Sequence, residues 1–225
     1  EFVRIPHADN SLHPVNPAAN RDALVLLSDV LPTAYECGVL SGAIRPGNTV
    51  AVIGAGPIGL AVLLTARLFS PAELIAVDTD AGRLERAHAF GATMLVDSEP
   101  AGAAEAILEA TDRRGVDVAV EAVGIPATFE LCQDIIAPGG RIANIGVHGK
   151  PATFHLERLW ASNITLTTRL VDTLATPELL AAILRKTLDP TRLITHRFAF
   201  PAMLDAYDTF ASPQKTNALK TLITA

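Results

Sequence analysis

Cysteine is scarce in this chain of 225 residues, and its two cysteines, Cys37 and Cys132, stand far apart. They form no CxxC pair, so their spacing argues against a disulfide framework. Unpaired cysteines in this number are typical of a reducing compartment. We therefore expect a cytoplasmic protein in which Cys37 packs rather than reacts.

An excess of basic residues and long apolar runs are also missing. The formal net charge is −6, which leaves no basic face to meet a phosphate backbone. No apolar run approaches the roughly 20 residues that span a bilayer. The chain begins with Glu1 and lacks the charged and apolar regions of a signal peptide. We expect a fragment or trimmed product with a small-molecule partner, and neither nucleic acid nor membrane as a partner.

Short apolar runs alternate with helix-like segments from residue 49 onward. The runs are TVAVIG (49–54), ELIAVD (73–78), TMLVD (93–97), VDVAVEAV (116–123), GRIANIGV (140–147) and ITLTT (164–168). Nearly continuous hydrophobic strands, each followed by a helix, are typical of a parallel sheet buried on both faces. We predict an α/β fold with a doubly wound parallel sheet of about six strands.

The segments on either side of this alternation have a different character. EFVRIP, at the start, predicts a short strand, and helical patterning follows from Ala23 to Leu40. After Thr173 the pattern predicts a helix (PELLAAILRK), a strand (LITHRFAF), a helix (MLDAYDTF) and a last strand (ALKTLITA). We therefore divide the chain into residues 1–40, 41–173 and 174–225.

The glycines of GAGPIG have the G-x-G-x-x-G spacing, directly after a predicted strand and at the start of a predicted helix. Gly54 permits the tight turn, Gly56 lets the backbone approach a pyrophosphate, and Gly59 permits close helix packing. The helix N-terminus offers free N–H groups to the anion. The motif predicts a dinucleotide site on a Rossmann sheet, although glycine-rich turns also serve as plain connections.

An acidic residue completes the motif. Asp78 ends the next predicted strand, 19 residues after Gly59, where a carboxylate accepts hydrogen bonds from the ribose hydroxyls of an adenosine. Its charge repels a 2′-phosphate, so we expect NAD rather than NADP. The alternative is an exposed strand-end residue that caps the following helix.

Asp29 lies in LVLLSDVLPTAY, after an apolar run and before Pro32. If the run is buried and takes the carboxylate with it, the burial costs several kcal/mol unless the charge is paired. One interpretation is a helix N-cap, with Ser28 or Asp29 accepting from free N–H groups. The other is a ligand for a cation.

The order of these motifs resembles that of the medium-chain, zinc-dependent alcohol dehydrogenases. The resemblance is carried by LSDVLPTAYECGV, VAVIGAGPIGL, VDVAVEAVG, RIANIGVHG, LITHRFAF and ALKTLITA. It covers essentially the whole chain but only the later part of the family's length. It implies that residues 41–173 form a Rossmann NAD-binding domain flanked by segments of a partial GroES-like catalytic domain. We expect LITHRFAF and ALKTLITA to pair with strands that this chain lacks.

The resemblance also implies roles for individual residues. Asp29 matches the third ligand of the catalytic zinc, whose other ligands, a Cys and a His, come from the family's earlier half. Thr33 matches the threonine that packs against the nicotinamide. The remaining matches are Ala55, Pro57 and Ile58 at the pyrophosphate turn, Arg83 beside the adenosine ribose, Val123, Ile145 and Val147 at the adenine and carboxamide ends, and Lys220 near the pyrophosphate. For Arg83 and Lys220, a merely solvated surface cation is the alternative.

The implied activity is hydride transfer from a primary or secondary alcohol to NAD, giving an aldehyde or ketone, with zinc stabilising the alkoxide. The six histidines form no HExxH or other ligand-spaced pair, so we expect this chain alone to bind NAD without zinc or activity. Two alternatives stay open: a zinc-free quinone or enone reductase, and a non-catalytic NAD-binding regulatory module. The edge candidate ITLTT resembles the family's dimer-forming edge, which implies a homodimer or homotetramer.

Overall fold

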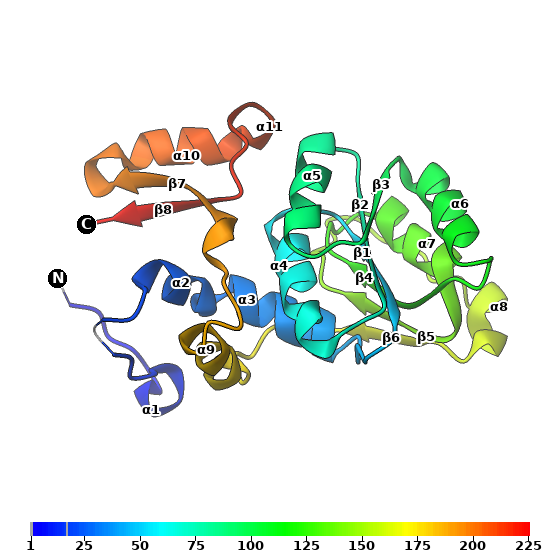
Figure 1. Ribbon diagram of the computed structural model, residues 1–225, viewed down its shortest axis with the longest axis horizontal. Coiled ribbons are helices and arrows are strands. Elements are labelled where there is room, and N and C mark those ends of the chain that lie inside the picture. Colours follow the sequence, from blue (N-terminus) through cyan, green and yellow to red (C-terminus); the bar gives the residue numbers. More distant parts are fainter. Residues whose placement is uncertain (1, 17) are drawn as a thin grey trace.

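The main body of the protein is a six-stranded parallel sheet, seen in a computed structural model that describes residues 2–16 and 18–225 (Figure 1). The strand order is β3-β2-β1-β4-β5-β6. The strands are β1 Thr49–Ile53, β2 Glu73–Asp78, β3 Met94–Asp97, β4 Val116–Glu121, β5 Ile136–Asn144 and β6 Thr165–Thr168. Because the order reverses between β1 and β4, the crevice for a ligand is expected at the carboxyl ends of these two strands.

Helices cover both faces of this sheet. Figure 1 shows α4 and α5 on one side and α6 and α7 on the other. The helices between the strands and after them are α4 Pro57–Ala66, α5 Ala81–Ala89, α6 Pro100–Ala110, α7 Pro126–Ile135, α8 Leu156–Leu159 and α9 Thr176–Leu184. The predicted doubly wound α/β sheet is confirmed.

Alternate residues of each strand enter opposite cores. In β1, Val50 and Val52 belong to the apolar cluster that includes α4 and α5, whereas Ala51 and Ile53 belong to the cluster that includes α6 and α7. Side chains alternate across a strand. A strand covered on both faces therefore has apolar residues at successive positions, as Val50–Ile53 of β1 has.

Strand β5 begins earlier and ends earlier than the sequence indicates. It starts at Ile136, which pairs with Val116, and the register with β4 then shifts before Arg141 pairs with Val118. It ends at Asn144. The expected range of 140–147 was therefore wrong at both ends, and residues 145–147 form a loop instead.

The first 40 residues are mainly short helical segments: α1 Ala8–Ser11, α2 Arg21–Val25, α3 Val30–Pro32 and a π-helical stretch, Thr33–Leu40. The predicted strand at EFVRIP is wrong for residues 2–6, which form no strand; Glu1 lies outside the described residues. A strand needs a neighbouring strand for its hydrogen bonds. No described strand runs beside this segment, and Phe2 and Val3 are left exposed.

The last residues form a separate two-stranded parallel sheet, at the upper left of Figure 1. Strand β7 (Ile194–Ala199) pairs with β8 (Lys220–Thr224), and α10 (Met203–Ala211) and α11 (Pro213–Thr216) connect them. The sequence did not predict that these two strands pair with each other, which they do through the crossover that contains α10. The expected pairing with strands from outside this chain stays a prediction.

Among the described residues no single helix has both the length and the apolarity to cross a membrane. The segments Arg21–Ser28 and Val30–Leu40 meet that test only as a pair bent by 60°.

Candidate functional site

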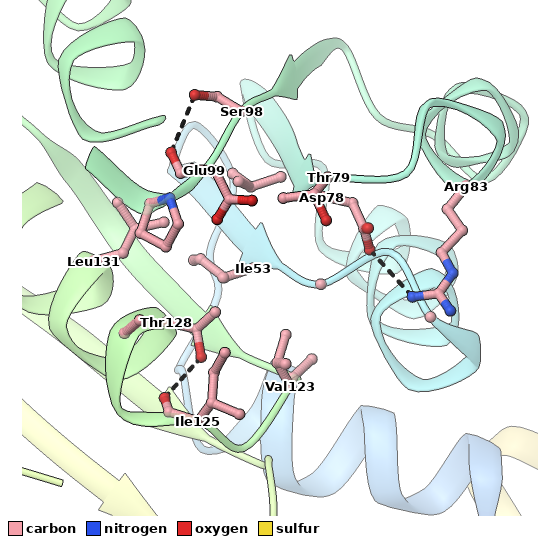
Figure 2. Close-up of a pocket in the computed structure, with 16 residues that line it drawn as sticks. Ile53, Asp78, Thr79, Arg83, Ser98, Glu99, Val123, Ile125, Thr128 and Leu131 are labelled. Carbon is pink, nitrogen blue, oxygen red and sulfur yellow. Dashed lines mark hydrogen bonds and ion pairs between the residues drawn. The ribbon is translucent and has the colours of Figure 1, made fainter. Parts of the chain in front are cut away.

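A pocket of about 410 Å³ lies at the carboxyl ends of β1, β2 and β4. Figure 2 shows Asp78, Thr79 and Arg83 on one side of it, with Val123 and Ile125 on another. Gly54 and Gly56 also line it. We call it the first pocket. The structure thus brings together the glycine motif, the predicted ribose acid and two further predicted residues, Arg83 and Val123.

The glycine motif forms the turn from β1 into α4. Gly54 has φ +100°, and a Cβ there would lie 2.6 Å from the Val123 side chain. A Cβ at Gly59 would overlap the carbonyl oxygen of Gly54. At Gly56 a Cβ would meet no described atom within 4 Å. The turn therefore exposes backbone toward the first pocket at the start of α4, a geometry that suits an anion.

The remaining residues predicted for this turn lie in it. Pro57 is at the start of α4, followed by Ile58. The N–H group of Ala55 donates to Asp78 Oδ2 at 2.7 Å. The glycine turn is therefore tied directly to the end of the neighbouring strand β2.

Asp78 is thus a structural anchor as well as a pocket residue. Its Oδ1 accepts the N–H of Asp80 at 3.0 Å, and Arg83 Nη1 lies 3.8 Å from its Oδ2. The side chain is 9% exposed. A carboxylate has about four acceptor positions, so these contacts leave capacity for ribose hydroxyls. The cap alternative is wrong, because Asp80, not Asp78, caps α5 through Arg83 N–H.

A second pocket, of about 460 Å³, adjoins the loop after β5. Asp29 and Thr33 line it together with Ile145 and Val147, as the resemblance implies for the nicotinamide end. The two pockets are adjacent, because a Cβ on Gly124 of the first-pocket loop would lie only 2.5 Å from the carbonyl oxygen of Val147. A dinucleotide could therefore span both.

Asp29 is not buried together with the apolar run around it. Asp29 is exposed, while Leu26, Leu27 and Val30 around it are buried. Asp29 sits at a break in the helix with φ −160° and ψ −60°, which turns its side chain away from the core. The N-cap interpretation also fails, since its carboxylate accepts no backbone N–H from the described residues and instead accepts the Thr33 hydroxyl at 3.0 Å.

The second pocket also holds a thiol and a guanidinium that sequence reasoning did not assign to it, Cys37 and Arg169. Burial raises the pKa of the Cys37 thiol, and the positive charge of Arg169 opposes that shift. Arg169 donates to Asp172 at 2.6 Å and lies 3.5 Å from the buried Glu36. Cys37 is therefore a neutral packing thiol, and Arg169 is largely balanced by two carboxylates.

Two further predictions concern Lys220 and the zinc site. Lys220 begins β8 in the two-stranded sheet and is absent from the described walls of both pockets. Among residues 2–16 and 18–225, no three His, Cys, Asp or Glu side chains gather closely enough to hold a metal ion. Asp29 therefore offers at most one metal ligand, and the described residues do not complete a zinc site around it.

Sequence reasoning missed Glu121, Thr128 and Asn144, which organise the loops between the pockets. Glu121 is fully buried at the end of β4, and Thr128 donates to its Oε1 at 2.7 Å. The signal was present: VDVAVE ends on an acid after a buried strand, as ELIAVD does at Asp78.

Comparison with known proteins identifies the family to which this fold belongs. The family profile described as zinc-binding dehydrogenase matches residues 57–185, more than half of the chain. An alcohol dehydrogenase of Cupriavidus necator is 31% identical over 99% of this chain and 62% of its own length. An NADP-dependent isopropanol dehydrogenase of Thermoanaerobacter brockii is 30% identical over 88% of this chain and 58% of its own.

Solved structures agree in fold. The apo form of zinc dependent alcohol dehydrogenase 2 from Streptococcus pneumonia superposes with a TM-score of 0.93 at 49% identity, over 99% of this chain and 64% of that one. Alcohol dehydrogenase TADH from Thermus sp. ATN1 gives 0.91 at 30% identity, over 98% and 63%. The chain spans less than two thirds of the length of these relatives. It belongs to the zinc-binding dehydrogenase family, the medium-chain zinc-type alcohol dehydrogenases.

Proposed function

We propose that this chain binds NAD across the two adjacent pockets, with the adenosine in the first and the nicotinamide in the second. The observation that carries the proposal is the tie between Ala55 and Asp78, which joins a glycine turn open to an anion with an acid suited to ribose hydroxyls. Thr33, Ile145 and Val147 supply the walls on the nicotinamide side.

The preference for NAD over NADP rests on Asp78. Its carboxylate faces the first pocket with one nearby cation, Arg83, so a 2′-phosphate there would meet a fixed negative charge. Arg83 is the counter-argument, because a guanidinium also pairs well with phosphate. One relative is named as NADP-dependent, and the calorimetric comparison below tests the choice between the two cofactors.

For the whole protein we propose alcohol oxidation. Oxidation removes a hydride from the alcohol carbon and releases the hydroxyl proton to water, and NAD would supply the hydride acceptor when bound. The chain's share is to hold the nicotinamide against Thr33 and the loop 145–147 and to exclude water from the second pocket. Asp29 faces the same pocket and would contribute one ligand to a catalytic zinc, with the other ligands supplied from outside the described residues.

The alternatives differ in what they require. A zinc-free quinone or enone reductase would consume NADH without metal, and a regulatory module would bind NAD without turnover. Asp29 favours the zinc enzyme, because it is an exposed carboxylate whose only described hydrogen bond is with Thr33 inside the pocket. A structural cap would instead accept backbone N–H groups.

Two measurements test the proposal. Calorimetry with NAD and NADP should give saturable binding to this chain, and a chain that binds neither would overturn it. The longer protein should contain zinc and form NADH from an alcohol. Turnover of enones without zinc would favour the reductase, and NAD binding without turnover would favour the module.

We also propose that the protein self-associates through β6. This strand is at an edge of the sheet, and Leu170 just beyond it is 89% exposed. Open edges and exposed apolar side chains both favour a second copy as partner. The free, buried cysteines are compatible with the cytoplasmic location we expect.

A further inference from the structure

One buried carboxylate holds the loop that lines the first pocket. Glu121 Oε1 accepts the N–H groups of Val123 at 3.0 Å and Gly124 at 2.9 Å, and the Thr128 hydroxyl at 2.7 Å. Val123 and Thr128 line the first pocket, whereas Glu121 itself lines neither pocket's described wall. Glu121 thus fixes this wall from behind. Figure 2 shows Val123, Ile125 and Thr128, the wall that it supports.

The same residue also holds the loop that lines the second pocket. Its main-chain carbonyl accepts the N–H groups of Ile145 at 2.8 Å and Gly146 at 3.1 Å. The loops touch so closely that a Cβ at Gly146 would overlap both Glu121 Oε2 and the nitrogen of Gly124. Hydrogen bonds to Glu121 therefore fix the positions of both loops.

The second carboxylate oxygen is unsatisfied. Among the described residues, Glu121 Oε2 has no hydrogen-bond partner, and His148 Nε2 lies 3.5 Å from it. Asn144 Nδ2 donates to the Gly146 carbonyl at 3.0 Å, which leaves Asn144 Oδ1 to accept from His148 Nε2 at 2.9 Å. The Nε2 proton is thus directed toward Asn144 Oδ1, and the same nitrogen lies beside Glu121 Oε2.

His148 is held in that position by packing. Its ring lies edge-on to Phe129 of α7, with 5.9 Å between centroids, and its Nδ1 is buried without a described partner. A buried carboxylate oxygen that lacks a hydrogen bond carries a desolvation penalty, which a nearby cationic or donor group reduces. The proximity of His148 to the unpaired Glu121 Oε2 therefore stabilises the position of the His148 loop against β4.

We propose that Glu121 and His148 form a brace that fixes the first-pocket loop, residues 122–125, against the second-pocket loop, residues 145–147. The proposal rests on the proposed function, because it assigns the brace the task of setting the nicotinamide end relative to the adenosine end. Neither residue lines a pocket wall among the described residues, so both are positioning residues.

The test compares two ligands that differ only at the nicotinamide, NADH and ADP-ribose, in a double-mutant cycle. Glu121→Gln keeps an oxygen for the three donors but places an amide donor against His148 Nε2. His148→Phe keeps a ring against Phe129 and removes Nε2. We expect each variant to weaken NADH about tenfold relative to ADP-ribose. The loss in the double variant should be clearly smaller than the product of the two single losses, because both changes remove the contact between Glu121 and His148. His148→Phe also removes the hydrogen bond to Asn144, so its own loss should be at least as large as that of Glu121→Gln.

A matched control is His155→Phe, which removes a histidine paired with Glu130 and Glu157 outside both pockets; its ratio of NADH to ADP-ribose affinity should equal that of the unmodified chain. Melting temperatures identify variants that fail to fold, and His148→Gln replaces His148→Phe in that case. Equal losses for both ligands, or losses that multiply in the double variant, would overturn the brace while leaving the proposed function intact. An unmodified chain that binds neither ligand would overturn both.

Discussion

Replacing Asp78 with Asn separates the two tasks of this residue. Asp78 Oδ2 accepts the Ala55 N–H and Oδ1 accepts the Asp80 N–H. A change to Gly would remove the negative charge and also release the glycine turn. Asn keeps the shape and one acceptor oxygen for Ala55, so the change in cofactor preference can be attributed mainly to the charge.

The expected size follows from Coulomb's law. Two unit charges about 4 Å apart interact by about 1 kcal/mol in water and by about 4 kcal/mol at the effective dielectric constant near a protein surface. The side chain of Asp78 is 9% exposed, and Arg83 at 3.8 Å offsets part of its charge. We therefore take the lower part of that range, about 1.4 kcal/mol, which corresponds to tenfold in affinity.

Calorimetry should show that the unmodified chain binds NAD at least about tenfold more tightly than NADP, and that Asp78→Asn removes most of this preference. NAD itself should weaken by about 1 kcal/mol, since a neutral amide replaces a charged acceptor at the ribose. Asp97→Asn is the matched control: Asp97 pairs with Asp78 across the sheet but is exposed and lies outside the described wall of the first pocket. A preference unchanged in a folded Asp78→Asn variant would refute the reasoning.

Three further changes test other parts of the structure. In the longer protein, Asp29→Ala should abolish zinc-dependent turnover with a much smaller effect on NAD affinity. Asp29→Cys should restore part of the turnover, because a thiolate also binds zinc. An Asp29→Asn variant with full zinc content and full turnover would contradict the ligand role. Glu36→Gln should lower the free energy of unfolding, measured in urea, by about 2 kcal/mol. The two carboxylate oxygens of Glu36 accept the N–H groups of Ala175 at 2.8 Å and Asp172 at 3.2 Å, whereas an amide has only one acceptor oxygen. The exposed Glu85→Gln is the control, and equal stability of the two variants would count against the reasoning. Hydrogen bonds to Glu157 and Glu130 raise the pKa of His155 above its ordinary value of 6.5. The contribution of His155 to the stability of the fold should therefore be complete below pH 6.5 and lost as the pH rises through the raised pKa. Proton NMR should show the raised pKa, and His155→Gln should abolish this pH dependence; a pKa at the ordinary value would refute the prediction.

The sheet could be predicted from the sequence because burial on both faces leaves a continuous apolar signal, as in TVAVI of β1. The start of β5 was missed, because Pro138 and the two glycines after it predict a turn, whereas in the structure they lie within the strand, at a register shift between Ile136 and Arg141. The pairing of β7 with β8 also escaped prediction, because it depends on where α10 places two strands far apart in the chain.

The site shows the same division at the level of single residues. The glycine spacing and Asp78 could be found, because tight turns and strand-end acids leave local patterns. The exposure of Asp29 could not, since it depends on a backbone break with φ −160° inside an apolar run. His148 is more remote still: only the folded chain places its ring between Glu121 and Phe129, from three different elements.

Asp78 and Glu121 have the same structural role at the ends of two strands. Each is an acid that follows a buried apolar run, and each accepts backbone N–H groups from the loop beside it: Ala55 for Asp78, and Val123 and Gly124 for Glu121. In both cases a carboxylate near the two pockets also holds the loop beside it in place. Loss of binding after removal of either acid is therefore ambiguous on its own, because a misplaced loop and a lost ligand contact both weaken affinity. Two tools resolve this ambiguity. Isosteric amides keep the shape of the side chain and one acceptor oxygen. Pairs of ligands that differ at one end, such as NADH and ADP-ribose, show at which end of the ligand the affinity is lost.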